Sequence, residues 1–190
     1  MKVGRSGIAP LRIRSVLIPL DGSPFAEHAI PWATVLARAA RAKLRLTLVH
    51  QPPEPPPADR ATRRLYTRIQ LALRKSQRDY LRAAATKIKA EGPVRITSAT
   101  LHGTPGPALA KYVDEVGVDL VVMTTHGRGG LERAWLGSVA DHLVRALEVP
   151  VLLIRPVEGT AVSPRVEEIL VTLDGSRRAE AVLPPARSRW

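Results

Sequence analysis

The chain has 190 residues, of which 45% are hydrophobic and only 4% aromatic. This length fits one domain with additional segments, and an aliphatic core favours a parallel sheet covered by helices over an aromatic-rich β-sandwich. The sequence contains no cysteine, which excludes disulfides, thiolate metal sites and a cysteine nucleophile. The formal net charge of +12 suits an anionic partner, but few aromatic residues and no long basic run argue against nucleic acid and favour a generally basic surface.

Five short apolar or alternating segments have the character of strands. They are residues 16–20, 44–49, 94–101, 119–124 and 151–154. Segments with helical periodicity follow them in the chain, at residues 23–40, 60–91, 107–116 and 138–147. Strands that alternate with helices predict an α/β fold with a doubly wound parallel sheet, in which ligands bind outside the carboxyl ends of the strands.

Capping residues mark the start of two helices. Ser23 is expected to be the N-cap of the first helix, with Pro24 at its first position. Pro31 should bend this helix or delay its regular part. Ser138 is expected to cap the last helix, in a capping box with Asp141.

The helix predicted at residues 60–91 is long and strongly amphipathic. Its apolar residues lie on or near one face, and the opposite face is rich in arginine and lysine. We interpret this basic face as solvated, in preference to a nucleic-acid contact. A proline-rich loop at residues 51–59 precedes the helix, and a turn is expected at residues 103–106.

An internal repeat suggests how the chain is divided. Residues 16–33 and 169–186 share Leu-Asp-Gly-Ser, then Ala-Glu, then a proline, at the same offsets. The N-terminus is basic but lacks the apolar region of a signal peptide, and no apolar run approaches the length of a membrane span. The expected parts are a basic tail at 1–14, a domain at 15–156, a linker at 157–168 and the truncated start of a second copy at 169–190.

Two glycine-rich elements follow the fourth predicted strand. They are residues 127–130, which read Gly-Arg-Gly-Gly, and the pair Gly137 and Ser138. Glycines let backbone N–H groups approach an anion closely, and a helix N-terminus favours phosphate. Arg128 and Arg133 can add positive charge. A simple turn with an N-cap explains the same residues equally well, and no Walker or G-x-G-x-x-G motif is present.

The segment 119–156, together with residues 16–33, resembles the universal stress protein family. ATP-binding members of that family share Gly-x-x-Gly, nine residues, and then Gly-Ser or Gly-Thr. Here Gly127 is the second glycine, nine residues follow, and Gly137 and Ser138 come next, while Thr124 holds the place of the first glycine. The resemblance covers residues 15–156 and implies a Rossmann-like, five-stranded parallel sheet with strand order 3-2-1-4-5.

The resemblance also implies an adenine-nucleotide site. Pro19 and Asp21 would line the adenosine, and Val49 and Gln51 at the end of the second strand would contact the base. The residues that would lie beneath the nucleotide, or hold its ribose and phosphates, are Met123, Thr124, Gly127, Arg128, Gly130, Gly137, Ser138 and Val139. The implied cofactor is ATP, with Mg²⁺ bound through the phosphates.

The function implied by the resemblance is that of a cytoplasmic stress-response or signalling protein. It would act through nucleotide binding and through homodimerisation by the strand at 151–154. Two alternatives stay open: a nucleotide-free scaffold or truncated tandem fragment, and a weak ATPase. Asp21 as a catalytic carboxylate, and His50 and His126 as acid–base or metal residues, are less favoured than a turn residue and two loop histidines. We therefore expect no catalytic residue and no protein metal site.

Overall fold

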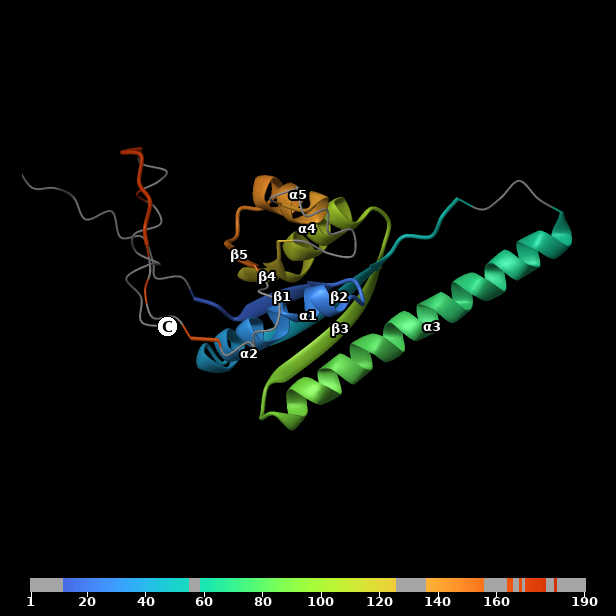
Figure 1. The fold of residues 1–190 in the computed structure, drawn as a ribbon, viewed down its shortest axis with the longest axis horizontal. Coiled ribbons are helices and arrows are strands. Elements are labelled where there is room, and N and C mark those ends of the chain that lie inside the picture. The colour runs from blue at the N-terminus through green and yellow to red at the C-terminus, as the bar shows by residue number, and fades with distance from the viewer. Residues whose placement is uncertain are drawn as a thin grey trace, which may run out of the picture.

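The strands of the protein form one five-stranded parallel sheet with the order β3-β2-β1-β4-β5. A computed structural model describes residues 12–54, 59–125, 136–155, 164–165, 168, 170–176 and 180. Both the doubly wound α/β class and the strand order 3-2-1-4-5 are confirmed (Figure 1). The strands are β1 (Ser15–Leu20), β2 (Lys43–His50), β3 (Arg95–His102), β4 (Leu120–Thr124) and β5 (Val151–Ile154).

Helices cover both faces of this sheet, as the alternating pattern predicted (Figure 1). One face carries α1 (Pro24–Glu27), α2 (Ala29–Ala39) and α3 (Arg60–Ala90), and the other carries α4 (Pro105–Val116) and α5 (Ser138–Ala146). Side chains alternate between the two faces along each strand, which creates two aliphatic clusters. Val16, Leu17 and Ile18 of the central strand β1 are fully buried because helices cover them from both sides.

Pro31, which was expected to bend the first helix or delay its regular part, lies just after a break between α1 and α2. Ser23 caps α1, since its hydroxyl oxygen accepts a hydrogen bond from the backbone N–H of Ala26 at 3.2 Å. The helix ends at Glu27, and α2 begins two residues later, at Ala29. Pro31 then lies in the first turn of α2, where its missing N–H has no intrahelical partner to lose.

Two predicted helix starts were wrong by one or two residues. Helix α4 begins at Pro105, inside the expected turn at 103–106, because Thr104 takes the N-cap position and Pro105 the first helical position. Helix α5 has Gly137 as its N-cap and no side-chain capping hydrogen bond, so the predicted capping box of Ser138 and Asp141 does not form. Ser138 is instead the first helical residue.

Helix α3 is much longer than the strands that it covers. Its 31 residues span roughly 45 Å, whereas an eight-residue strand spans about 26 Å. The N-terminal part therefore projects beyond the sheet (Figure 1). The helix contains ten basic residues and one acidic residue, a net charge of +9 against +12 for the whole chain. The net positive charge is thus concentrated on α3, whereas we had interpreted the net charge of +12 as a generally basic surface.

Candidate functional site

The sheet opens at its carboxyl edge between β1 and β4. Strand β1 pairs with β2 up to Leu20, and β4 pairs with β5 up to Thr124. Pairing between β1 and β4 themselves ends earlier, at Leu17 and Val121. The last three residues of each strand therefore diverge at the point where the strand order reverses. In doubly wound sheets, this switch point is where ligands bind.

The turn that follows β1 is held by the Asp21 carboxylate. One carboxylate oxygen accepts hydrogen bonds from the backbone N–H of Ser23 at 2.8 Å and from the Ser23 hydroxyl at 2.6 Å. Gly22 adopts a φ of 79°, in the left-handed region where a glycine is favoured. Asp21 thus fixes the shape of the turn, the role that we favoured over a catalytic one, and it does so while remaining half-buried.

Three of the residues that were predicted to contact the nucleotide share one face of the sheet. Met123 and Val49 belong to the aliphatic cluster under α4 and α5. Pro19 alternates with Leu17, a member of the same cluster, and so points to that face too. Gln51 follows the end of β2 and is exposed. The structure therefore brings together an apolar surface from β1, β2 and β4 near the switch point.

Thr124 faces the other way. It follows Met123 on β4, so its side chain points to the face covered by α1 and α2, and it is only 5% exposed. The sequence analysis expected Met123 and Thr124 to lie together beneath one ligand. This would require two consecutive residues of a strand to point to the same face. The strand period of two residues instead sends them to opposite faces.

The N-terminus of α5 lies beside the end of β4. The backbone N–H of Gly137 donates to the carbonyl of Thr125 at 2.7 Å, and Thr125 N–H donates to the carbonyl of Ile154 at 3.0 Å. The first intrahelical bond runs from the N–H of Asp141 to Gly137. Backbone N–H groups at the start of an α-helix have no intrahelical acceptor, and the N-cap residue Gly137 has no side chain with which to cap them. Such an end attracts anions, phosphate in particular.

The positions of Ser138 and Val139 suit a ligand that approaches this helix end. Ser138 is exposed and Val139 half-buried. Gly127, Arg128 and Gly130 lie outside the described residues, as do His126 and Arg133. Their predicted roles in binding ribose and phosphate stay predictions. Among the described residues, no group of three or more His, Asp or Glu side chains is arranged to hold a metal ion.

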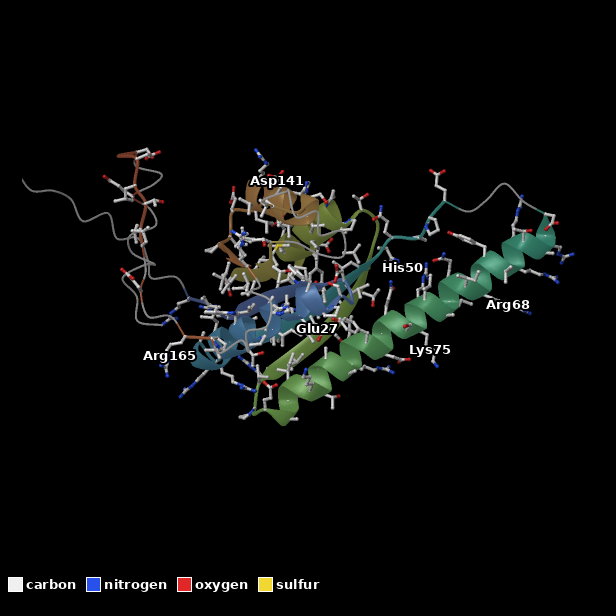
Figure 2. All side chains as sticks on the ribbon, viewed as in Figure 1. Glu27, His50, Arg68, Lys75, Asp141 and Arg165 are labelled. Atoms are coloured by element: carbon white, nitrogen blue, oxygen red, sulfur yellow. The ribbon has the colours of Figure 1, made fainter. Side chains whose placement is uncertain are left out.

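His50 differs from the loop histidine that the sequence suggested. It is the last residue of β2, is 2% exposed, and lies between the sheet and α3 (Figure 2). Its Nδ1 lies 3.0 Å from the Gln77 side-chain oxygen, and its ring meets that of His102 edge-on at 5.6 Å between centroids. Sequence reasoning missed Gln77 and His102. The register of β2 and β3, which pairs His50 with His102, is what brings the histidines together.

The second Leu-Asp-Gly-Ser segment folds into the same turn as the first. Gly175 has a φ of 81°, and the backbone N–H of Ser176 donates to the Asp174 carboxylate at 2.8 Å, as Ser23 does to Asp21. Hydrogen bonds from the hydroxyl and backbone of Ser176 lower the pKa of Asp174. Most of the segment at 157–190 lies outside the described residues, so the repeat can be compared only at this turn.

Comparison with known protein families identifies relatives that share this fold and sequence. The model of the Universal stress protein family matches residues 12–155. Universal stress protein Rv1996 of Mycobacterium tuberculosis is 31% identical over 175 residues, which cover 85% of this chain and 54% of that protein. The chain therefore spans about half the length of the curated relatives that it matches.

Solved structures agree with this assignment. The universal stress protein UspA from Lactobacillus plantarum superimposes with a TM-score of 0.67 at 21% identity, covering 76% of this chain and 99% of that one. A universal stress protein crystallised in complex with cAMP superimposes with a TM-score of 0.55 at 27% identity, covering 76% of this chain and 98% of the other. Within the described residues, no helix is both long and apolar enough to cross a membrane.

Proposed function

Since this chain belongs to the universal stress protein family, we propose that it binds an adenine nucleotide at the carboxyl edge of the sheet, between β1 and β4. The observation that carries this proposal is the early end of β1–β4 pairing at Leu17 and Val121, next to the N-terminus of α5, where the N-cap residue is a glycine. A separated switch point and a free helix end are the two features that nucleotide sites of doubly wound sheets combine. A relative with 27% identity was crystallised with cAMP, which supports the same class of ligand.

In this proposal, each part of the nucleotide meets a different part of the edge. The apolar surface of Pro19, Val49 and Met123 accommodates the adenine, and Gln51 contacts its rim. Asp21 faces the ribose hydroxyls from its rigid turn.

The phosphates lie at the other side of the opening. Free N–H groups of Ser138 and Val139 at the start of α5 hold them, together with Gly127, Arg128 and Gly130. ATP is the expected nucleotide, with Mg²⁺ bound through its phosphates. The side chain of Thr124 points to the α2 face and so does not occupy the side of β4 on which Met123 lies.

The test is calorimetric titration of the purified protein with ATP, AMP and cAMP, beside the variant Gly137→Val. The backbone at Gly137 has φ −70° and ψ 153°, which valine adopts without strain, so the variant adds bulk at the proposed phosphate position without straining the backbone. Ala146→Val is the matched control, since it places the same side chain at the exposed far end of α5.

We expect binding by the wild type and by Ala146→Val, and loss of binding in Gly137→Val. Equal affinities for Gly137→Val and the wild type would refute this site. No binding of any of the three nucleotides by the wild type would favour the scaffold alternative. ATP hydrolysis that disappears in Asp21→Ala would instead indicate an ATPase.

We also propose that two copies associate through β5. This four-residue strand forms the edge of the described sheet, is rich in aliphatic residues, and pairs on one side with β4. An aliphatic edge strand exposes backbone groups that a second strand can bind. Sedimentation velocity should show a homodimer for the wild type and a monomer for Val151→Lys. A monomeric wild type at micromolar concentration would contradict this proposal.

The segment from residue 169 is proposed to begin a second domain of the same family, in a protein that acts in the cytoplasm in stress response or signalling. The shared turn at Asp21 and Asp174 supports a common origin of the two segments. Sequencing the gene beyond codon 190, in all three frames, tests the repeat. A continuing strand–helix pattern with a second glycine motif is expected, and unrelated sequence in every frame would contradict it.

A further inference from the structure

A groove of about 410 Å³ lies between α3 and the edge strand β3. It is separate from the proposed nucleotide site, because the groove lies on the sheet face that α3 covers, whereas Val49 and Met123 lie on the face that α4 and α5 cover. Its volume falls in the range of small-molecule pockets.

Three arginines and Leu81 form the helical wall of the groove. Arg74, Arg78 and Arg82 are spaced four residues apart, which places each about 6 Å further along the helix axis. Within the described part of the chain, Arg74 and Arg78 make no ion pair and no side-chain hydrogen bond. Arg82 contacts Asp79 at 3.6 Å, but both side chains are largely exposed and such a pair is weak.

The strand wall is polar. Ser98, Thr100 and His102 alternate along β3 and so point to the α3 face, where all three line the groove. Ser98 and His102 are exposed and offer a hydroxyl and an imidazole. The buried Thr100 hydroxyl has no hydrogen-bond partner among the described residues. Buried polar groups normally have such a partner, so this wall has a hydrogen-bonding group that the described protein residues leave unused. No carboxylate is among the residues that line the groove.

We propose that this groove binds a small ligand that carries a chain of two or more phosphoryl groups. Guanidinium groups form paired hydrogen bonds to phosphate oxygens, and three of them in a row along about 12 Å match a linear polyanion better than a single phosphate. Hydroxyl and imidazole groups on the facing wall supply further donors. The lining residues include no aromatic side chain on which bases would stack, which disfavours single-stranded nucleic acid.

The experiment is calorimetric titration with tripolyphosphate, pyrophosphate and orthophosphate at about 0.1 M salt, where charges more than roughly 10 Å apart are screened. The test variant is Arg74→Gln/Arg78→Gln. The matched control is Arg64→Gln/Arg68→Gln, which removes the same charge at the same spacing from exposed positions nearer the N-terminus of α3. Arg68 points away from the sheet (Figure 2). Circular dichroism verifies that both variants keep the helix.

We expect the affinity to rise with the number of phosphoryl groups, and to fall at least tenfold in the test variant while changing less than about twofold in the control. An equal loss in both variants would show a general effect of charge and overturn the proposal. So would the absence of binding to any of the three probes, or tighter binding of a single-stranded RNA oligonucleotide that the test variant also weakens. Titration of Gly137→Val with tripolyphosphate distinguishes the two sites. Loss of binding in this variant would show that tripolyphosphate binds at the N-terminus of α5, and would overturn the proposal of a site in the groove. Retained binding supports the groove.

Discussion

The contact between α4 and α5 leaves no room for a side chain at Gly106. A Cβ atom built there would lie 2.7 Å from Cγ and Cδ2 of His142 and 3.0 Å from its Cβ. Carbon atoms normally pack at about 3.5–4.0 Å, so Gly106→Ala must displace the His142 ring and move the helices apart by about 0.5 Å. The close approach of the His142 Cβ means that a rotation of the ring alone cannot relieve the clash.

Overpacking of this kind costs about 1–3 kcal/mol, and replacing a helical glycine by alanine returns at most about 1 kcal/mol. We therefore expect Gly106→Ala to lower the free energy of unfolding by about 1–2 kcal/mol in urea denaturation. In the background His142→Ala the two ring contacts at 2.7 Å are absent and only the Cβ contact at 3.0 Å remains, so the same change should cost less. An equal loss in both backgrounds would refute this account of the α4–α5 contact.

Three further predictions concern single hydrogen-bonded groups. Ser23→Ala removes the cap of α1 and should cost about 1 kcal/mol in the same assay, and an unchanged midpoint would contradict the capping role. Asp119→Ala should cost about 1–3 kcal/mol, because the carboxylate accepts two backbone N–H bonds at the start of β1, one of them from Ser15 at 2.9 Å; a neutral result would mean that water replaces both. The pKa of Asp59, the N-cap of α3, is lowered mainly by a hydrogen bond from the backbone N–H of Thr62, and further by one from the Thr62 side chain. The stabilisation from this cap is fully present above the ordinary carboxyl pKa and is lost as the pH falls through the lowered one. Amide exchange of Thr62 followed by NMR should accelerate over that window, and a profile identical to that of Asp59→Asn would disprove the linkage.

Much of the fold could be predicted because its signals are local and strong. An aliphatic run such as Leu120–Thr124 is typical of a strand that helices cover on both faces, and such runs, together with the resemblance, led to the observed strand order. Helix starts were less predictable. Ser138 looks like a cap from its residue type, but the cap position is defined by backbone angles, which Gly137 adopts.

The site was predictable in its parts but not in its orientation. The sequence analysis predicted that Pro19, Val49 and Met123 lie at the carboxyl edge of the sheet, and in the structure they also lie on the same face of it. The opposite orientation of Thr124 follows from the two-residue period of a strand. The groove of α3 was not predictable, because it depends on which side of a 31-residue helix meets the edge strand β3. Sequence periodicity identified a basic face without showing that Arg74 and Arg78 line a cavity.

The position of β1 at the centre of the sheet has a consequence for the order of folding. Its neighbours are β2, which follows closely in the chain, and β4, which does not: the Asp119 carboxylate reaches the N–H of Ser15 across 104 residues. A growing chain can pair β1, β2 and β3 early, but the switch point forms only when β4 docks beside β1, a slow, non-local step. We therefore expect the two halves of the proposed nucleotide site to form at different times during synthesis. A ligand that needs both would report that the whole sheet has closed.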